Sequence, residues 1–441
     1  MRRKTTLFFS MMVVALLAAT GVAIAQQEEG STTPSSSGGA VENAIPHQYI
    51  VVLKQGIDNP KSVAREHARR YDADLLYTYD DALNGYAANI PAGNLDDVRQ
   101  DPRVSFVSAD RKVHATAQST PTGVDRIQGD ASSTLSGNGS GSVNTAVAII
   151  DTGIDVDHPD LNVAGGTNCS TGRTYDDGNG HGTHVAGTVA AKDDANGVVG
   201  MAPGARLYAA RVLNNNGSGS WSSVVCGIDW VTANAGSLGI KVANMSLGGS
   251  GSDDGNCGNS NNDALHKAIC KSVAKGVTYV VAAGNSNTNF SGFVPAAYNE
   301  VVTVTAEADF NGQPGGGAAA TCRADVDETP ADFSNFTTAG STDEGHTIAA
   351  PGVCILSTWK GGAYNTISGT SMASPHVAGT AALLLSQQNL TTQQTMSKLR
   401  SDAAAQPASY GFVGDPYNPI TTGGGRPSTL YYGHLAYAGG Y

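Results

Sequence analysis

Residues 146–155 read AVAIIDTGID, a continuous apolar run that ends at an acidic residue and a turn. Its apolar residues are consecutive rather than alternating, which is typical of a strand buried on both faces. Further runs of this kind, separated by segments of helical composition, lie at residues 206–213, 241–245, 279–283 and 301–304. The sequence therefore predicts an α/β domain over residues 117–441, with a mostly parallel sheet covered by helices on both faces.

A smaller domain is predicted before this one, over residues 47–116. Its elements follow the order strand, helix, strand, strand, helix, strand, which is the ferredoxin-like α+β pattern. Residues 26–46 are polar and rich in Ser, Gly and Pro, so we expect a flexible linker there. The expected strands of the small domain are 49–53, 75–79, 86–90 and 104–107, and its expected helices are 61–70 and 95–100.

The N-terminus has the features of a secretory signal peptide, which we place at residues 1–25. Basic residues 2–4 precede an apolar run at residues 7–19, and Ala23-Ile24-Ala25 offers small residues for cleavage. A membrane anchor is the alternative, but the run is shorter than the ~18 apolar residues of a span. No cysteine follows it that could carry a lipid. We therefore expect a secreted, extracellular protein that is free of the membrane once the signal is removed.

Composition and charge narrow the choice of partners. The chain has 441 residues, of which 40% are hydrophobic and 15% charged, so it can bury a large core. Its 38 acidic and 26 basic residues give a net charge of −12, which repels phosphate backbones, and nucleic acid is not an expected partner. Six cysteines in an exported chain favour disulfides, and we prefer the short-range pairs Cys257–Cys270 and Cys322–Cys354. The lack of a C-x-x-C pair argues against zinc.

Three polar residues stand in settings that suit nucleophilic catalysis. Asp151 follows a strand, His181 opens a helix in GHGTHVAGT (180–188), and Ser371 lies at a turn into an apolar helix in SGTSMASPHVAG (368–379). A serine hydroxyl becomes a strong nucleophile when a base takes its proton, and that base needs a third group to fix its tautomer. Asp151, His181 and Ser371 supply these three roles.

A fourth residue completes this chemistry. Asn285 ends the apolar stretch AAGN (282–285), and its side chain can donate a hydrogen bond to a developing oxyanion. The backbone N–H of Ser371, at a helix start, is a second unpaired donor. Gly284 leaves room for a substrate carbonyl. We therefore expect an oxyanion hole formed by Asn285 and Ser371.

The sequence resembles the subtilisin family of secreted serine proteases, the subtilases, from about residue 49 to near the C-terminus. The resemblance rests on the blocks AIIDTGIDVDHPDL (148–161), GHGTHVAGT, AAGN and GTSMASPHVAG (369–379), in the order Asp, His, Ser. It implies an endopeptidase in which Asp151 orients the histidine, His181 is general base and acid, and Ser371 is the nucleophile of an acyl-enzyme pathway. No cofactor is implied for the chemistry.

The resemblance also implies how substrate binds and how activity is controlled. Substrate backbone would add as a strand between two protein segments. Residues 47–116 resemble an inhibitory propeptide that is self-cleaved, with a mature start at Ala117. Protein and peptide substrates and the chain's own propeptide are thus the expected partners, and we expect a monomer. The implied substrate-binding residues are Gly217, Ser218, Gly219, Ser246, Leu247, Gly248, Gly249, Ala282, Ala283 and Gly284.

A calcium site is a further implication of the resemblance. The loop at residues 191–200 has the length of the family's calcium loop, and oxygen ligands suit Ca²⁺. The departures from the family pattern are Lys192, which would contribute its carbonyl, Asp193 and Asp194. The implied ligands are Gln118, Asp160, Lys192, Asp194, Asn196 and Val198. The Gly-rich inserts that carry Asp253, Asp254, Asp325 and Asp327 are expected to be solvated loops rather than further metal sites.

The same residues also bear on other possible functions. Asp151-Thr152-Gly153 is also an aspartic-protease signature, but that mechanism needs two carboxylates and a second such triplet is absent. The G-x-S-x-G motif of lipases and esterases is absent too. A pseudoprotease would be expected to lack at least one catalytic residue, and none is missing. The sequence does not distinguish a hydrolase from a peptide ligase, because an amine can replace water in capturing the acyl-enzyme.

Overall fold

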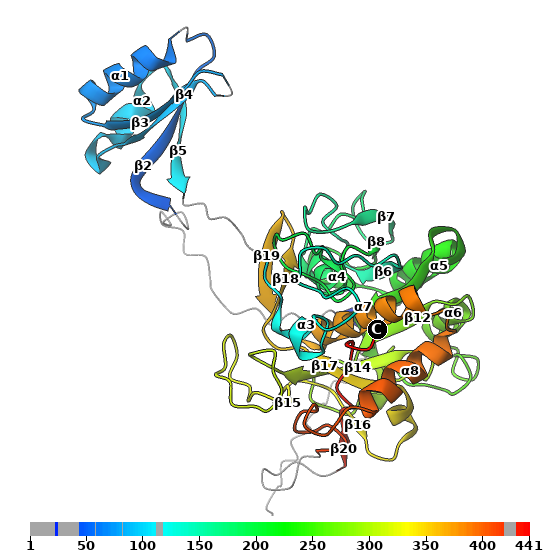
Figure 1. The fold of residues 1–441 in the computed structure, drawn as a ribbon. Coiled ribbons are helices and arrows are strands. Elements are labelled where there is room, and N and C mark those ends of the chain that lie inside the picture. The colour runs from blue at the N-terminus through cyan, green and yellow to red at the C-terminus, as the bar shows by residue number, and fades with distance from the viewer. Residues whose placement is uncertain (1–22, 25–43, 58, 82, 112–117, 419–428) are drawn as a thin grey trace, which may run out of the picture. The chain divides into compact units, whose positions relative to one another are not determined.

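The computed structural model describes residues 23–24, 44–57, 59–81, 83–111, 118–418 and 429–441 (Figure 1). Most of the predicted signal peptide and linker, and the predicted junction at Ala117, lie outside the described residues. The chain forms two compact units, Glu29–Thr116 and a larger one of Ala117–Tyr441 with Met1–Glu28. In the part of the chain that is described, no helix has the length and apolar character needed to cross a membrane.

The smaller unit has the predicted order of elements. Its four strands form an antiparallel sheet in the order β3-β4-β2-β5, and the helices pack on one core with Val51, Tyr86 and Val98. Helix α1 begins where the Asn59 side chain accepts the Ser62 N–H and Pro60 takes the first position, which needs no donor. The bounds are β2 (Ala44–Leu53), α1 (Pro60–Arg70), β3 (Asp74–Tyr79), β4 (Gly85–Asn89), α2 (Leu95–Gln100) and β5 (Val104–Arg111).

The larger unit is built on one eight-stranded sheet. The strand order is β15-β14-β12-β10-β6-β8-β7, and β17 also pairs with β14. Every pairing is parallel except that of β15 with β14. The bounds are β6 (Ala146–Asp151), β7 (Val163–Asn168), β8 (Arg206–Arg211), β10 (Ile240–Met245), β12 (Thr278–Ala282), β14 (Val302–Ala308), β15 (Thr329–Pro330) and β17 (Thr347–Pro351).

Both faces of this sheet are covered by helices, as predicted. On β6, Val147 and Ile149 point into one core, whereas Ala148 and Ile150 point into the other. The first core includes residues of α4 (His181–Ala190), α7 (Thr370–Gln387) and α8 (Thr392–Ala404). The second includes residues of α5 (Trp221–Leu238) and α6 (Ala264–Val273). Burial on both sides explains why the strands read as continuous apolar runs.

Short elements and cross-links complete the larger unit. Both expected disulfides, Cys257–Cys270 and Cys322–Cys354, are confirmed, and the remaining cysteines form Cys169–Cys226. The short elements are β1 (Ala23–Ile24), α3 (Thr122–Arg126), β9 (Ser218–Gly219), β11 (Gly249–Ser250), β13 (Phe293–Val294), β16 (Thr337–Thr338), β18 (Ile355–Trp359), β19 (Ala363–Ile367) and β20 (Leu430–Tyr431).

The two inserts are mostly exposed loops, as expected, but several of their acidic side chains are turned away from solvent. The side chains of Asp254 and Asp325 are 5% and 2% exposed. Asp327 accepts the backbone N–H groups of Phe310 and Ala318, both at 2.9 Å. Gly-rich loops leave backbone donors without ladder partners, and these carboxylates satisfy them.

Candidate active site

Asp151 and His181 meet at the carboxyl edge of the sheet. Asp151 is the last residue of β6, and His181 is the first residue of α4. The His181 Nδ1 lies 2.7 Å from Asp151 Oδ1, and both side chains are buried. A β-carbon at Gly182 would collide with the Gly153 carbonyl oxygen and lie 3.2 Å from that of Asp151, so glycine at this position lets helix and strand approach. His181 Nε2 has no hydrogen-bond partner among the described residues and is free to act on another group.

The surroundings of His181 favour its protonated form. Burial alone lowers the pKa of the imidazole, but the negative charge and hydrogen bond of Asp151, together with the charge of Asp177, raise the pKa above its ordinary value. An imidazolium formed at this position would therefore be stabilised by both carboxylates. This is what a general base requires at the moment it takes a proton.

Asp177 is a site residue that the sequence analysis missed. Its buried carboxylate accepts the Gly180 N–H at 2.9 Å and both the N–H and the hydroxyl of Thr183, at 3.0 and 2.6 Å. It also accepts the Thr152 hydroxyl at 2.9 Å. Asp177 thus joins the start of α4 to the end of β6 and fixes where His181 lies. Its one signal in the sequence was its position in the Gly-rich turn before His181.

Ser371 lies in the first turn of α7, tied to the end of β10. Its hydroxyl donates to the Ser246 carbonyl at 3.3 Å, rather than to His181. The Ser371 carbonyl accepts the Ser246 hydroxyl at 2.8 Å, and Asn244 donates to that hydroxyl at 2.9 Å. Ser374 donates to Asn244 at 2.7 Å. The anchoring roles of Asn244 and Ser374 were also missed, because they depend on contacts more than a hundred residues apart.

The two expected oxyanion donors border the same space. The Asn285 Oδ1 accepts the N–H and the hydroxyl of Thr370, at 2.9 and 2.7 Å, which fixes the orientation of its amide. A β-carbon at Gly369 would lie 3.4 Å from Asn285 Nδ2 and 3.6 Å from the Ser371 nitrogen. An oxygen placed near that point could accept from both donors.

Gly284 has a packing role that the sequence analysis did not anticipate. Its φ is +101°, a conformation that favours glycine, and a β-carbon there would collide with the Asn335 amide and press on the Phe293 ring. Its N–H donates to the Thr370 hydroxyl at 3.1 Å, which joins the end of β12 to α7. Ala282 and Ala283, just before it, are buried.

The first expected substrate segment is a strand edge that another segment of the chain occupies. A turn that ends at Gly217 leads into β9, and β9 pairs antiparallel with β1 of the N-terminal region. The edge at Ser218 and Gly219 therefore accepts an extended segment of chain, which is the contact that β-augmentation needs.

Part of the second expected substrate segment, residues 246–249, pairs or packs with other residues of the fold. Gly249 belongs to β11, which pairs with β13, and the Leu247 side chain is buried, so this segment can offer mainly backbone. A β-carbon at Gly248 would collide with Phe293. Next to both segments is a cavity of about 710 Å³, with a wall that includes Trp221, Val225, Ser250, Ser252, Leu265 and Val294.

Four of the implied calcium ligands lie together. Gln118 Nε2 donates to the carbonyl of Lys192 at 2.8 Å, with the carbonyl of Val198 at 3.4 Å, and Asp160 Oδ2 accepts the Val198 N–H at 3.0 Å. Gln118 Oε1 and Asp160 Oδ1 are buried acceptors without a partner among the described residues, which fits a cation. Burial raises the pKa of Asp160 to about 7, and it outweighs the hydrogen bonds that the carboxylate accepts from the Val198 N–H and the Tyr364 hydroxyl.

The acidic residues of the loop at residues 191–200 have separate roles. Asp194 and Asn196 are exposed and hydrogen-bond to each other, with Asp194 Oδ1 accepting the Asn196 N–H at 3.1 Å. Asp193 points elsewhere and accepts the backbone N–H groups of residues 137, 139 and 141 at 3.0, 2.7 and 3.1 Å. The departure at Asp193 therefore serves to hold a neighbouring loop.

Comparison with known proteins agrees with this geometry. Residues 142–427 match the model of the subtilase family, and residues 48–116 match that of peptidase inhibitor I9. These matches define a serine endopeptidase with a subtilisin-like fold. The chain belongs to the subtilase family, and it carries an I9 propeptide domain ahead of the protease domain.

Several subtilisins are similar over most of the chain. Subtilisin E from Bacillus subtilis (strain 168) is 36% identical over 376 residues, covering 82% of this chain and 87% of that protein. Subtilisin DY from Bacillus licheniformis is 42% identical over 293 residues, covering 65% of this chain and 92% of the relative. M-protease from Shouchella clausii (strain KSM-K16) is 39% identical over 314 residues, covering 71% and 72%.

Proposed function

We propose that this enzyme hydrolyses peptide bonds through a triad of Asp151, His181 and Ser371. The observation that carries the proposal is the buried 2.7 Å contact between His181 Nδ1 and Asp151, which leaves Nε2 as the reactive nitrogen. Ser371 stands at a helix start beside the amide of Asn285. Catalytic hydrogen bonds are often long or absent before substrate binds, so the contact of Ser371 with Ser246 is compatible with this role.

The proposed reaction has two halves. The Ser371 hydroxyl gives its proton to His181 Nε2 as its oxygen attacks the scissile carbonyl carbon, and the new oxyanion accepts from Asn285 Nδ2 and the Ser371 N–H. His181 then protonates the departing amine, leaving an acyl-Ser371 ester. A water molecule, deprotonated by His181, attacks the ester, and the proton returns to Ser371 as the acid product leaves. Throughout, Asp151 stabilises the charged imidazole.

We also propose the setting in which this chemistry occurs. The N-terminal signal pattern supports secretion, and the I9 domain supports synthesis as a zymogen that cleaves itself near Ala117. Substrate would lie extended between residues 217–219 and 246–249, with the wall at residues 282–284 near the side chain before the scissile bond. A calcium ion held by Gln118, Asp160 and the carbonyls of Lys192 and Val198 would neutralise the buried Asp160 carboxylate, with Asp194 and Asn196 as candidate further ligands.

Casein hydrolysis tests the central assignment. Phenylmethylsulfonyl fluoride and the Ser371→Ala variant should each abolish it, because both remove the nucleophilic oxygen from reaction. The matched control is Ser386→Ala near the other end of α7, where the hydroxyl caps the Leu383 carbonyl, and this variant should retain activity. Hydrolysis that survives in Ser371→Ala would show that another residue is the nucleophile.

A further inference from the structure

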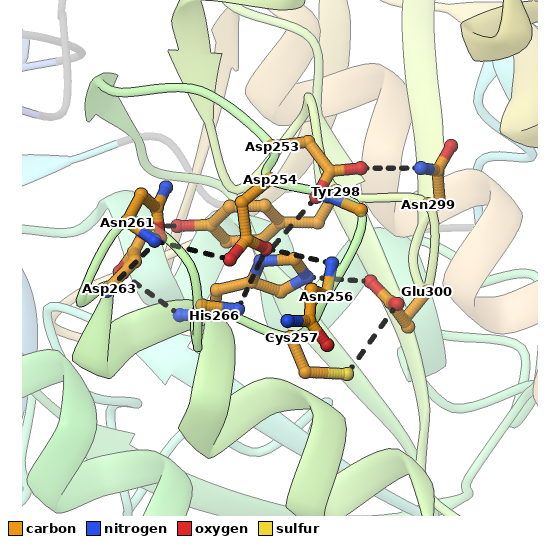
Figure 2. Close-up of polar contacts among 12 residues, drawn as sticks. Asp253, Asp254, Asn256, Cys257, Asn261, Asp263, His266, Tyr298, Asn299 and Glu300 are labelled. Atoms are coloured by element: carbon orange, nitrogen blue, oxygen red, sulfur yellow. Dashed lines mark hydrogen bonds and ion pairs between the residues drawn. The ribbon is translucent and has the colours of Figure 1, made fainter.

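A buried histidine outside the active site is held in a fixed orientation. His266, on α6, is fully buried, and its ring stacks on Tyr298 with centroids 4.0 Å apart and planes 3° from parallel (Figure 2). Its Nε2 lies 2.8 Å from the Glu300 carboxylate. Tyr298 is fixed in turn, because its hydroxyl donates to Asp263 at 2.5 Å. The contact of Nε2 with Glu300 and the stacking on Tyr298 together fix the orientation of the His266 ring.

The other ring nitrogen points at two carboxylates. His266 Nδ1 lies 3.3 Å from Asp254 Oδ1 and 3.5 Å from Asp253 Oδ1, and it makes no hydrogen bond among the described residues. These three atoms lie within 4.8 Å of one another. Ligand atoms about 2.0–2.1 Å from one tetrahedral metal ion are separated by roughly 3.4 Å. Both distances to the nitrogen fit a shared metal ion better than they fit hydrogen bonds.

The carboxylates are also held in place. Asp254 Oδ1, the atom 3.3 Å from His266 Nδ1, accepts backbone N–H groups from Asn256 and Gly258, both at 2.9 Å, and Asp254 Oδ2 accepts that of Ser260 at 2.7 Å. Asp253 accepts the Gly255 N–H at 2.8 Å, and its other oxygen accepts the amide of Asn299. The nearby Cys257 and Cys270 form a disulfide, so their sulfurs are not available as thiolate ligands.

We propose that Asp253, Asp254 and His266 bind one divalent transition-metal ion, with zinc as the ion that best suits them. An imidazole nitrogen with carboxylate oxygens is a common ligand set for Zn²⁺, whereas Ca²⁺ takes oxygen ligands. Glu300 is a positioning residue, because a carboxylate that accepts Nε2–H leaves the Nδ1 lone pair for the metal. The site uses no cysteine, so it does not depend on a C-x-x-C pair.

The bound metal would fix the loop beside the cavity described above. Asp253 follows Ser252, and His266 follows Leu265, and both of those neighbours line the cavity. A metal bridging Asp253, Asp254 and His266 would therefore close the base of the insert, where the Cys257–Cys270 disulfide also ties it to α6. This is a structural site, independent of the proposed peptide-bond chemistry.

The alternative is a metal-free imidazolium paired with three carboxylates. Burial lowers the pKa of His266, but the hydrogen bond and charge of Glu300 and the charges of Asp253 and Asp254 raise it above its ordinary value. Protons therefore compete with the metal for Nδ1, and metal binding should weaken on acidification. Experiment can distinguish whether Nδ1 carries a proton or binds a metal ion.

Calorimetric titration with Zn²⁺ tests the proposal. The mature protein, inactivated with phenylmethylsulfonyl fluoride to prevent autolysis and stripped of metal, is titrated at pH 7.5 with excess Ca²⁺ present. We expect one Zn²⁺ per chain, lost in His266→Gln and weakened about 10–100-fold in Glu300→Gln. Asp332→Asn, which changes an exposed acid elsewhere, is the matched control and should bind normally.

Co²⁺ supplies a second readout that does not depend on a variant folding. Visible absorption bands of a four- or five-coordinate Co²⁺ centre should appear with one equivalent and disappear when Zn²⁺ is added. If His266→Gln does not fold, Glu300→Gln and the Co²⁺ spectrum decide the question. The proposal is overturned if the wild-type chain takes up no Zn²⁺, if folded His266→Gln binds it unchanged, or if nitrogen NMR shows Nδ1 protonated with and without Zn²⁺.

Discussion

Asp177 acts on His181 both through the backbone and through its charge. Its carboxylate fixes residues 180 and 183 at the start of α4, so the imidazole projects from a rigid turn. Its charge adds to that of Asp151, and together they outweigh the effect of burial, which alone would lower the His181 pKa. Asp177 is therefore a positioning residue for His181, the proposed general base.

The Asp177→Asn variant should move the acid limb of activity. Removing the negative charge destabilises the imidazolium, so the pKa of His181 falls and the neutral base persists to lower pH. We expect the acid limb of kcat/KM to shift toward lower pH, with a smaller maximum because the turn loses part of its support. The measurement is the pH profile of kcat/KM on a peptide ester or amide.

The neighbouring Asp176→Asn is the control, because Asp176 is exposed and does not contribute to the His181 shift. Its profile should match that of the unmodified enzyme. A limb that stays fixed in Asp177→Asn, or moves toward higher pH, would show that Asp177 does not act on the His181 charge.

At the scale of elements, the candidate active site is assembled where strands end and helices begin. β6 ends at Asp151, β10 leads to Ser246, and β12 leads to Asn285, all at one edge of the parallel sheet. Helices α4 and α7 begin at that same edge, with His181 and Thr370 as their first residues. Hydrogen bonds between these ends, rather than within any one element, fix the geometry.

The site formed by the candidate calcium ligands should give the protein a pH-dependent stability. The pKa of Asp160 is raised to about 7 in the folded chain, above the ~3.9 of an exposed aspartate. Without a cation, the folded state then binds more protons than the unfolded state between these values, so stability falls as pH rises through them. Calcium favours the ionised carboxylate, and its stabilisation should grow over the same range.

Melting temperatures of the metal-stripped protein with and without added Ca²⁺ at pH 5 and pH 8 measure this effect, on protein inactivated with phenylmethylsulfonyl fluoride. We expect a larger gain from Ca²⁺ at pH 8, and little or none in Asp160→Asn. The exposed Asp157→Asn should behave as the unmodified protein does. Equal melting temperatures with and without Ca²⁺ at pH 8 would contradict a calcium site here.

The sequence predicted five strands of the large sheet, because burial on both faces leaves an unbroken apolar run, as in β6. It missed β7 and β17 of the same sheet, and the short strands. Strands such as β9 and β11 have two residues and exist through pairing with distant segments, which no local pattern records. The hairpin of β18 and β19 was missed as well, although Gly361 and Gly362 mark its turn.

The sequence likewise predicted the reactive residues of the candidate site but not the residues that position them. Asp151, His181 and Ser371 could be predicted because each lies at the start or end of a strongly patterned element. Asp177, Asn244 and Ser374 could not be predicted, because polar residues are common in turns and helices and the role of these three depends on long-range contacts. His266 was hidden for the same reason, since its partners Asp253 and Glu300 lie on other segments.

At the scale of the whole molecule, the chain consists of two units, and we expect only the larger one to remain in the active enzyme. The I9 domain has its own core and its own antiparallel sheet. The protease unit is a large sheet dominated by parallel pairing between distant strands, a topology that folds slowly. A folding helper that also blocks the site until it is removed suits such a protein.

Secreted protein should therefore have lost its first unit. Mass spectrometry of the purified, active enzyme should show an N-terminus within a few residues of Ala117. The Ser371→Ala variant, which cannot cleave itself, should retain the segment that begins near residue 47. Active enzyme that still carries this segment in covalent linkage would contradict the zymogen proposal.

Labelling with a fluorophosphonate probe tests the central claim most directly, because the probe reacts with a serine only when a base activates it. The account predicts that peptide mapping of the folded enzyme finds the phosphonate on Ser371, and that His181→Ala or prior denaturation abolishes the labelling. Probe found on a different residue, or labelling of Ser371 that persists without His181, would contradict a serine activated by the buried Asp151–His181 pair.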